Sequence, residues 1–453
     1  MKKRYAIVGT GSRVRLYIDG LCNQYKAHGD LIAICDTNQI SMDYNKNFIL
    51  RKFSSNKIKT YHPNHFEKMI KDNKIEVVIV TSIDCTHHLY IVSAMKLGCD
   101  VITEKPLTTQ ISYCDFIFKA IKDYEKKLTV TFNYRYTPRN AKIKELLTSG
   151  IIGEVKSIHF EWFLDTSHGA DYFRRWHRDK RNSGGLMIHK ASHHFDLVNW
   201  WINSKPISVY GNGDLVFYGK KNAEERGIYN SFYRATGSAG AKRDPFALDL
   251  SSGLLESLYL NAEDEDGYLR DLNVFGDGIS IEDDMSLIVK YASGTTMTYH
   301  LTAYSPCEGF RIAFNGTKGR IDYFVEESSY VSGSVKDKNT PIKSFKTENN
   351  SKNQIIIRPH WEESYEIKMP PEELSGHGGG DKRMLEDIFA NKNKDNFRQI
   401  ADHRDGAYAF LVGLAANESF RLNLPINISR HYFENYTIKY LNETTYPLSN
   451  LSL

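Results

Sequence analysis

The chain lacks the features that mark several classes of protein. Its six cysteines are scattered and include no Cys-x-x-Cys pair, which argues against a disulfide framework and predicts reduced thiols. It contains no apolar run long enough to span a bilayer, so no membrane partner is expected. Long arginine–lysine runs are also missing and the net charge is only +4, so nucleic acid is not an expected partner either.

The N-terminus carries no recognisable targeting segment. The apolar stretch Tyr5–Val8 is shorter than a signal-peptide core, and glycines follow it at once. Together with the reduced cysteines, this predicts a cytoplasmic protein.

The length and the pattern of the first part predict an α/β domain. A chain of 453 residues is long enough for two or three domains, each with its own core. Residues 1–132 alternate short, β-branched-rich apolar runs such as Val77–Thr81 with amphipathic stretches such as Leu89–Leu97. This alternation predicts a parallel, doubly wound sheet.

A change of pattern near residue 133 predicts a second domain over residues 133–453. Pro138 suits the first residue of a helix that ends at Ser149. Longer strands of alternating polarity follow, and they predict an open, mainly antiparallel sheet with a few helices. Two polar stretches, at about 219–244 and about 332–354, are predicted to be insertions.

A glycine-rich turn follows the first strand directly and opens a predicted helix. The turn comprises Gly9, Thr10, Gly11, Ser12, Arg13 and Val14. Its two glycines allow backbone N–H groups to approach a pyrophosphate, although Val14 replaces the third glycine of the dinucleotide fingerprint. Asp36 ends the second strand, where a carboxylate binds ribose hydroxyls and repels a 2′-phosphate. The pattern predicts NAD(H) rather than NADP(H).

Lys105 lies at the carboxyl end of another predicted strand, in the run Glu104-Lys105-Pro106. The proline fixes its own φ and keeps the lysine out of helical space. Open α/β sheets place their ligands at this edge. A lysine there can bind an anion, hold a hydroxyl, or move a proton if burial lowers its pKa.

Several segments together resemble one family. They are the glycine turn with Asp36, Thr81 at the end of its strand, Glu104-Lys105-Pro106, Asn133–Pro138 and Gly150–Val155. In order and spacing they are similar to the corresponding segments of the Gfo/Idh/MocA oxidoreductases. These motifs are specific for the family and not for a substrate.

The resemblance implies a Rossmann domain, then an α/β domain, with a cleft where a sugar, inositol or related polyol meets the nicotinamide. It implies that Lys105 is the catalytic lysine and that Asn133 and Arg135 lie beside cofactor and substrate. It also implies that the open sheet serves in oligomerisation, so a homodimer or homotetramer is expected. The expected cofactor-binding residues are Gly9, Thr10, Gly11, Ser12, Arg13, Asp36, Thr81, Ser82, His87, Glu104, Lys105 and Asn133.

A histidine-rich helix forms the second chemical centre, because helical spacing puts His189, His193 and Asp196 on one face. The family pattern is a glycine pair, an aspartate, and then a histidine one turn later. This chain keeps the glycines and His193 but has His189 in place of the aspartate. A histidine near its unperturbed pKa suits proton transfer, so His193 is the predicted base, with Lys105 holding or relaying the same proton. His189 either orients the substrate or shares the base role.

Further residues are candidates for contact with the substrate, since aromatic and basic side chains suit stacking and hydrogen bonding to a sugar. They are Arg135, Trp162, Arg178, His189 and His194. Thr86 is predicted to cap the helix that follows it. Two histidines one turn apart can bind zinc, but no glutamate follows His189 and the resemblance supplies no metal, so none is expected.

Three functions are weighed. The leading hypothesis is an NAD-dependent dehydrogenase for a secondary hydroxyl of a sugar, polyol or glycoside, in which Lys105 steadies the alkoxide. The second is an NAD-dependent glycoside hydrolase acting by transient oxidation and elimination, with the extra histidines as acid and base. The third is a non-catalytic, NAD-bound sugar sensor.

Overall fold

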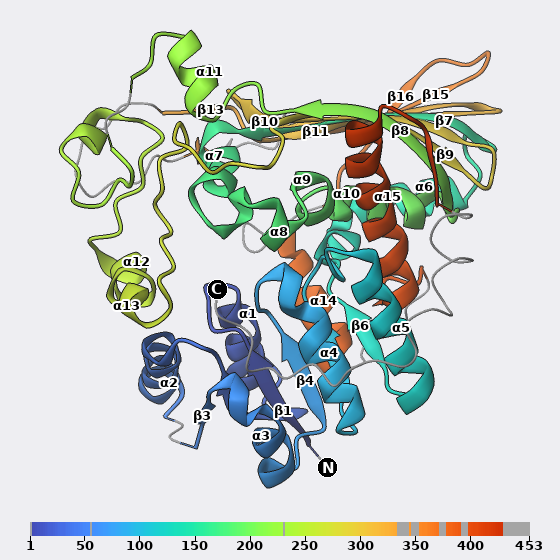
Figure 1. Ribbon diagram of the computed structural model, residues 1–453. Helices are drawn as coiled ribbons and strands as arrows, with labels where there is room; N and C mark the ends of the chain where they lie inside the picture. Colours follow the sequence, from blue (N-terminus) through green and yellow to red (C-terminus); the bar gives the residue numbers. More distant parts are fainter. Residues whose placement is uncertain are drawn as a thin grey trace.

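The computed structural model describes residues 2–54, 57–229, 232–332, 344–345, 353–370, 377–390 and 397–428. Two sheets lie one above the other in Figure 1, with the N-terminal strands in the lower sheet and several helices between the two. The lower and upper sheets belong to different parts of the chain, and the space between them holds the residues discussed below.

The lower sheet is parallel except at one edge. In the order β17-β6-β5-β4-β1-β2-β3, β17 runs antiparallel to its neighbour β6. The strands are β1 (Lys3–Val8), β2 (Gly29–Cys35), β3 (Lys59–Tyr61), β4 (Val77–Val80), β5 (Asp100–Thr103), β6 (Leu128–Val130) and β17 (Ala401–Asp402). All of β4 is buried, as expected for a strand covered on both faces. The order reverses between β1 and β4, which is where open α/β sheets bind ligands.

Helices alternate with these strands along the chain, as the sequence pattern predicts. They are α1 (Val14–Asp19), α2 (Gln39–Phe53), α3 (Phe66–Asn73), α4 (His87–Lys96) and α5 (Ile111–Tyr124). Asn38 begins α2 with a side-chain cap, because its Oδ1 accepts a hydrogen bond from the N–H of Ser41 at 2.9 Å. The cap also fixes the direction in which the chain leaves Asp36.

The upper sheet is mainly antiparallel. Its order is β16-β15-β12-β11-β7-β10-β9-β8-β18, in which β10 and β7 form a parallel pair. The strands are β7 (Val155–Asp165), β8 (Pro206–Asp214), β9 (Asp284–Tyr291), β10 (Thr296–Ser305), β11 (Glu308–Gly316), β12 (Gly319–Ser328), β15 (Gln354–Pro359), β16 (Tyr365–Ile367) and β18 (Ile426–Asn427). Burial alternates along β9, so one face is covered and the other is open. The two sheets confirm the predicted fold class.

Helices that follow the first six strands cover the lower face of this sheet in Figure 1. They are α6 (Pro138–Thr148), α7 (Thr166–Arg174), α8 (Lys180–Ser183), α9 (Leu186–His189), α10 (Ser192–Ile202) and α15 (His403–Leu422). The buried face of α10 packs Phe195 against Tyr299 of β10, with ring centroids 5.1 Å apart. Trp201 donates to the carbonyl oxygen of Asn140 at 2.9 Å and so joins α10 to α6. This packing fixes the position of the histidine-rich segment.

The chain returns to the lower sheet near its end. Helix α14 (Gly380–Ala390) packs Met384, Leu385 and Phe389 into the same apolar cluster as the first two strands. Strand β17 then adds to the edge of the lower sheet beside β6. The lower layer is therefore built from both ends of the described chain.

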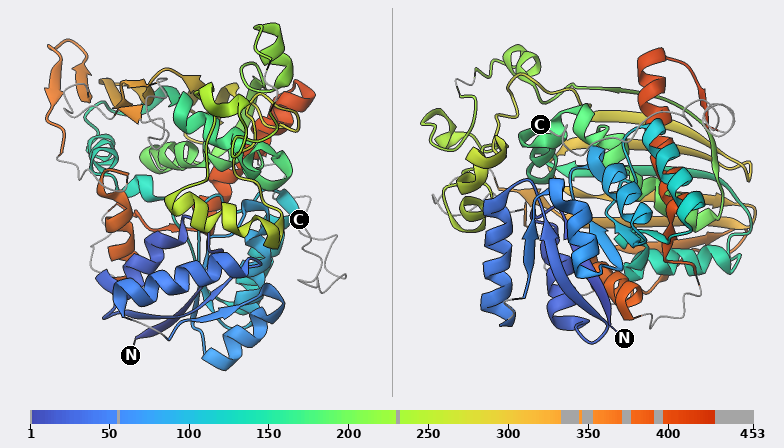
Figure 2. Two further views of the ribbon diagram at one scale, coloured as in Figure 1. Left: turned by 90° about the vertical axis from the view of Figure 1, so that its left-hand side faces the viewer. Right: turned by 60° about the horizontal axis from the view of Figure 1, so that its bottom comes forward.

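A long excursion separates β8 from β9. It spans residues 215–283 and includes α11 (Lys220–Glu225), α12 (Gly253–Leu258) and α13 (Glu263–Asp266). Figure 1 and the side view in Figure 2 show α12 and α13 reaching down to α2 of the lower layer. The stretch 219–244, which the sequence predicts to be an insertion, lies within this excursion. Most of the expected insertion at 332–354 lies outside the described residues.

Within the described part of the chain, no helix has the length and apolar character needed to cross a membrane.

Candidate active site

A large cavity opens between the two layers, at the carboxyl ends of β1, β4 and β5. Its volume is about 1530 Å³, which exceeds the range of about 300–1,000 Å³ typical of a pocket for one small ligand. All twelve expected cofactor-binding residues line it, together with His189, His193 and Arg178. The cavity therefore has room for two ligands side by side.

The glycine turn after β1 closely approaches the turn after β4. Gly9 has φ +90°, and a Cβ placed there would lie 2.5 Å from the backbone nitrogen of Ser82. Only glycine fits this position, because the backbone conformation and the close contact both exclude a side chain. The turn ends where α1 begins at Val14, and its residues Gly11, Ser12 and Arg13 face the cavity.

Asp36 follows β2 and lies against the same turn. Its Oδ2 accepts hydrogen bonds from the backbone N–H of Thr10 at 2.5 Å and from the Thr10 hydroxyl at 2.8 Å. Its Oδ1 accepts from the N–H of Asn38 at 3.1 Å. These bonds hold a carboxylate at the rim of the cavity, where the sequence predicts contact with a ribose.

The excursion from the upper layer covers this end of the cavity. The Tyr259 hydroxyl accepts a hydrogen bond from the N–H of Ser12 at 3.1 Å. The Asn38 amide donates to the Ala262 carbonyl oxygen and to Asp266 Oδ2, both at 2.9 Å. Tyr259 and Asp266 also line the cavity. We call residues 253–268 the strap, because this segment spans the gap between the two layers.

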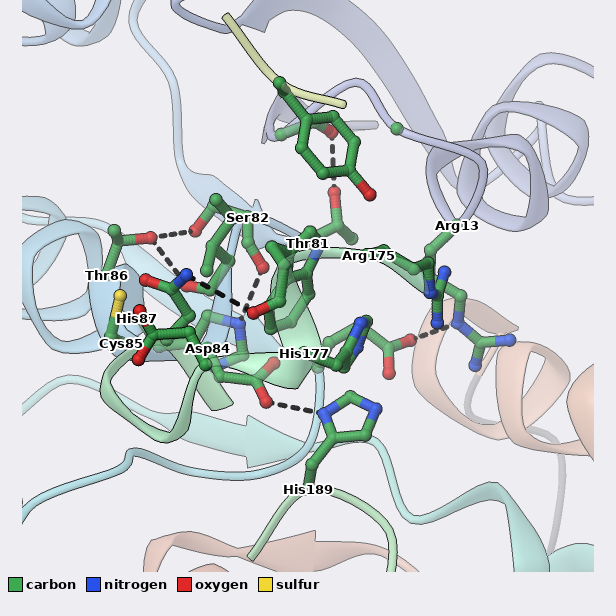
Figure 3. A pocket seen from close by; sticks show the side chains of 18 of the residues that line it. Arg13, Thr81, Ser82, Asp84, Cys85, Thr86, His87, Arg175, His177 and His189 are labelled. Carbon is green, nitrogen blue, oxygen red and sulfur yellow. Dashed lines mark hydrogen bonds and ion pairs between the residues drawn. The ribbon is translucent and has the colours of Figure 1, made fainter. Parts of the chain in front are cut away.

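The turn after β4 is fixed by a network of hydrogen bonds, which Figure 3 shows around Thr81, Ser82, Thr86 and His87. The Thr81 hydroxyl donates to the carbonyl oxygen of Gly9 at 2.7 Å. The Nδ1 of His87 lies 2.8 Å from the Pro106 carbonyl oxygen, so α4 is joined to the segment after Lys105. Thr86 stands before α4, but its hydroxyl donates to the Ile83 carbonyl oxygen at 2.7 Å. The expected side-chain cap by Thr86 is therefore wrong, because the hydroxyl is already used in the preceding turn.

Glu104, beside Lys105, is held by two donors of the first helix. Its Oε1 accepts from Arg13 Nε and from the Tyr17 hydroxyl, both at 2.6 Å. Asn133 donates to Asp381 of α14 at 2.8 Å. These contacts stabilise the end of β5 from below and leave Lys105 facing the histidine-rich segment.

Lys105, His189 and Asp84 form a compact, buried group. The Nζ of Lys105 donates to the His189 carbonyl oxygen at 2.9 Å and lies 3.4 Å from His189 Nε2. The other ring nitrogen, Nδ1, lies 2.5 Å from Oδ2 of Asp84, as Figure 3 shows. Burial lowers the pKa of Lys105 to about 8, although the Asp84 carboxylate acts to raise it. Burial and the nearby charges of Lys105 and Arg175 hold the pKa of His189 well below its usual value.

His193 lies on α10, one turn beyond His189, and also lines the cavity. Its ring stacks on the ring of Tyr134 with centroids 4.6 Å apart. A further wall is formed by Tyr172, Trp176 and His177, whose imidazole ring is 4.2 Å from that of His189. The arrangement offers titratable side chains beside flat aromatic surfaces.

Three of the expected substrate contacts, Arg135, Trp162 and His194, do not line the cavity. Arg135 forms a buried, bidentate ion pair with Asp196, at 2.7 Å and 2.5 Å. Trp162 is buried and its ring stacks on that of His194 at 4.0 Å, and His194 Nδ1 bonds the Tyr299 hydroxyl at 2.7 Å. None of these three side chains lines the cavity, because each packs into the core of the upper layer.

Arg178 does line the cavity, but its guanidinium forms hydrogen bonds with the excursion between β8 and β9. It donates to the carbonyl oxygens of Asn273 at 3.2 Å and Asp277 at 2.6 Å.

Asp84, Tyr259 and Asp266 are cavity residues that sequence reasoning missed. The position of Asp84 in the turn after a buried strand was a usable signal, whereas nothing in the sequence relates the strap to the glycine turn. Among the described residues, no group of three or more His, Cys, Asp or Glu side chains is arranged to hold a metal ion.

Comparison with known proteins explains the architecture. The profile of the oxidoreductase family's NAD-binding Rossmann fold matches residues 3–132, and that of its C-terminal alpha/beta domain matches residues 144–428. The chain belongs to the Gfo/Idh/MocA oxidoreductase family. Members of this family share both layers described above, so the predicted family is confirmed.

Similar proteins include one relative over almost the whole chain. The Bacillus subtilis (strain 168) protein named as the oxidoreductase YteT is 32% identical over 450 residues, which are 94% of this chain and 98% of that protein. An inositol 2-dehydrogenase from Rubrobacter xylanophilus is 26% identical over 151 residues, 32% of this chain and 39% of that enzyme. The structure of the WlbA dehydrogenase from Bordetella pertussis, in complex with NADH and UDP-GlcNAcA, shares the fold with a TM-score of 0.58 at 16% identity. That comparison covers 94% of this chain and 99% of the other.

The residues of this chain fit the dinucleotide that the family binds. Gly9 lets the glycine turn lie against the turn after β4. At Gly11, which lines the cavity, an added Cβ would have only the Tyr259 hydroxyl within 4 Å, so the turn leaves room for a ligand there. Asp36 stands at the ribose position of the fingerprint. The cavity continues from this turn to Lys105, so one ligand bound along it would reach the histidines.

Proposed function

We propose that this family member is an NAD-dependent oxidoreductase that transfers a hydride between nicotinamide and a secondary hydroxyl of a sugar, polyol or glycoside. The observation that carries the proposal is the placement of Lys105, His189 and His193 in the same cavity as the complete set of expected cofactor-binding residues. A nicotinamide bound there supplies the hydride acceptor or donor. The residues of the chain supply orientation and proton transfer.

His193 and Lys105 have different tasks at the reacting hydroxyl. His193 takes the proton from the hydroxyl oxygen as general base. The Lys105 ammonium donates a hydrogen bond to that oxygen and stabilises the negative charge that develops on it. His189 holds Lys105 in place through its carbonyl oxygen, at 2.9 Å. The low exposure of this group excludes water and strengthens the electrostatic interaction.

A carbohydrate fits the surface next to these residues. Trp176 and His177 stack at 3.5 Å and form part of the cavity wall, and Tyr172 and Arg175 line it as well. Flat aromatic faces with a few fixed polar groups are typical of small-molecule sites. The inositol 2-dehydrogenase among the similar proteins acts, by its name, on a polyol. These observations support a polyhydroxylated substrate.

The cofactor we propose is NAD rather than NADP. Asp36 places a carboxylate at the ribose position, and Asp266 of the strap places a second one 2.9 Å from the Asn38 amide. A 2′-phosphate needs a cation in this pocket, and two carboxylates repel it.

We also propose a cytoplasmic homodimer or homotetramer. All six cysteines are free, in keeping with a reducing compartment. The open face of the upper sheet carries exposed side chains such as Tyr210 and Ile288, and we propose that it pairs with a second copy of the chain. Light scattering of the purified protein tests the assembly, and a monomer over the micromolar range would contradict it.

A screen of sugars, polyols and glycosides with NAD tests the activity, with NADH absorbance and sugar release followed together. A dehydrogenase accumulates NADH in proportion to substrate. Release of sugar with catalytic NAD and no NADH indicates the hydrolase instead, and binding without either signal indicates a sensor. Lys105→Ala should lower turnover by about 10²–10³-fold with nearly unchanged NAD affinity, whereas Lys96→Ala, on the far end of α4, should change neither. Unchanged turnover in Lys105→Ala would contradict the proposed site.

A further inference from the structure

Asp84 has no role in the mechanism proposed above, yet it lies at the centre of the site. It is 3% exposed and sits in the turn after β4, while its partner His189 ends α9 of the other layer. The two residues are 105 positions apart, and Asp84 Oδ2 lies 2.5 Å from His189 Nδ1. Figure 3 shows the two side chains pointing directly at each other.

This contact decides which nitrogen of His189 carries the proton. Burial raises the pKa of Asp84 well above its usual value, while the charges of Lys105 and Arg175 act to lower it. When Asp84 is ionised beside these two cations, its carboxylate accepts hydrogen bonds, so a neutral imidazole beside it carries its proton on Nδ1. The ring is neutral because burial and the positive charges of Lys105 and Arg175 disfavour its charged form. The other nitrogen, Nε2, is therefore left with a free lone pair.

That lone pair faces Lys105. The Lys105 ammonium has three N–H donors. One is given to the His189 carbonyl oxygen at 2.9 Å, and a second points towards Nε2 at 3.4 Å. One donor is left for a ligand in the cavity. In the opposite tautomer Nε2 would carry a proton itself and could not accept from the ammonium.

Asp84 also acts on the charge of Lys105. Burial lowers the pKa of Lys105 to about 8, and the Asp84 carboxylate is the largest influence in the opposite direction. The charged and titratable groups that face Lys105 come from every element around it. They are Asp84, Glu104, Arg13, His87, His177, His189, Lys190 and His194. Since Lys190 and Arg13 oppose a positive charge on Lys105, Asp84 and Glu104 are needed to maintain it.

We propose that Asp84 is a positioning residue that acts through His189 to hold Lys105 as an ammonium ion with one N–H directed at the substrate oxygen. This inference rests on the proposed function, in which Lys105 stabilises the developing alkoxide. It assigns Asp84 a task in the reaction in addition to joining the two layers.

The pH–rate profile of Asp84→Asn tests the proposal. In the unmodified protein the alkaline limb of kcat/KM should have its midpoint near pH 8, where Lys105 loses its proton. The Asp84 carboxylate raises that pKa, so its removal should move the limb to lower pH, by about one to three units. Asp84→Glu, which keeps the charge, should restore the limb towards pH 8. The matched control is Asp277→Asn, a cavity carboxylate that is 84% exposed, and its limb should not move.

Two further measurements separate positioning from folding and from the proposed function. His189→Gln keeps the Asp84 charge but removes the Nε2 acceptor, so kcat should fall while the limb stays near pH 8. Modification of Lys105 by an amine-directed reagent, followed by peptide mass spectrometry, reports its pKa without turnover. It should show the same downward shift in Asp84→Asn even if no substrate is found. A fall in activity with an unmoved limb and an unmoved Lys105 pKa would show that Asp84 only joins the layers, and would overturn the proposal.

Discussion

The two ends of the cavity are built in different ways. At the cofactor end, backbone groups form most of the contacts. The glycine turn, the end of β2 and the turn after β4 lie at neighbouring strands of one sheet. At the Lys105 end, buried side chains from both layers meet, and Asp84, His189 and Lys105 contact one another in turn. The first end needs small residues at fixed positions, whereas the second needs a set of charges that balance one another. We therefore expect substitutions at the cofactor end to change cofactor affinity, and substitutions at the Lys105 end to change turnover.

The largest expected effect is at the Lys105 end. His193→Ala should lower turnover by about 10²–10⁴-fold, because no base then accepts the hydroxyl proton. NAD affinity, measured by calorimetry, should change little, since His193 lies on the α10 side of the cavity. If NAD affinity fell by as much as turnover, the two ends would not be functionally separate.

His189→Asp sharpens the same test, because it restores the residue that the family pattern has at this position. The variant should fold and bind NAD. It places a negative charge one turn from His193, which should raise the pKa of that histidine and move the acid limb of the pH–rate profile to higher pH. A profile that responds to neither His189→Asp nor His193→Ala would mean that the proton moves through another residue.

The second effect concerns stability. Arg135→Ala leaves Asp196 buried without its bidentate partner, which should cost about 3–5 kcal/mol of unfolding free energy. Burial raises the pKa of Asp196 to about 7 even beside Arg135, and loss of the arginine should raise it further, so protonation of this carboxyl should offset more of the loss at pH 6 than at pH 8. Chemical denaturation at pH 6 and pH 8 measures both. If the variant were instead stable but had a raised KM, Arg135 would contact the substrate after all.

At the cofactor end, Asp36→Ser combined with Thr37→Arg should change specificity and leave the chemistry intact. The double variant removes one carboxylate and adds a cation near the ribose, so NADP affinity should rise and NAD affinity should fall. Titration with both cofactors measures the ratio. Equal affinity of the unmodified protein for the two would contradict the role of Asp36.

The smallest effect is expected from Tyr259→Phe. The change removes one hydrogen bond to Ser12, which contributes about 0.5–1.5 kcal/mol. The dissociation rate of NAD should therefore rise by no more than about tenfold, with an unchanged association rate. Stopped-flow fluorescence resolves the two rates. A change in kcat without a change in NAD release would show that the strap does not control NAD binding.

The cofactor end could be predicted from the sequence because its contacts are short-range. Gly9, Asp36 and Thr81 each follow a strand, and parallel strands bring their carboxyl ends to one edge without further information. The fold of both layers follows from the same periodicities. Their predicted order along the chain agrees with the two sheets observed.

The other end could not be read in the same way. Whether a buried polar residue faces a cavity or the core depends on the packing of several elements. The sequence therefore offered His194 and Trp162 as substrate contacts, although neither lines the cavity. Asp84 and His189 are 105 residues apart in the sequence, so no local sequence pattern reveals their contact. The strap contacts α2 through Asn38 and Ser41, and such a long-range docking leaves no periodic signal.

The strap also has a consequence for the timing of events. It leaves the upper layer, touches the lower one at Ser12, Asn38 and Ser41, and returns. A dinucleotide that left the cavity past α12 would have to break these hydrogen bonds, so we expect its release to wait until the strap moves.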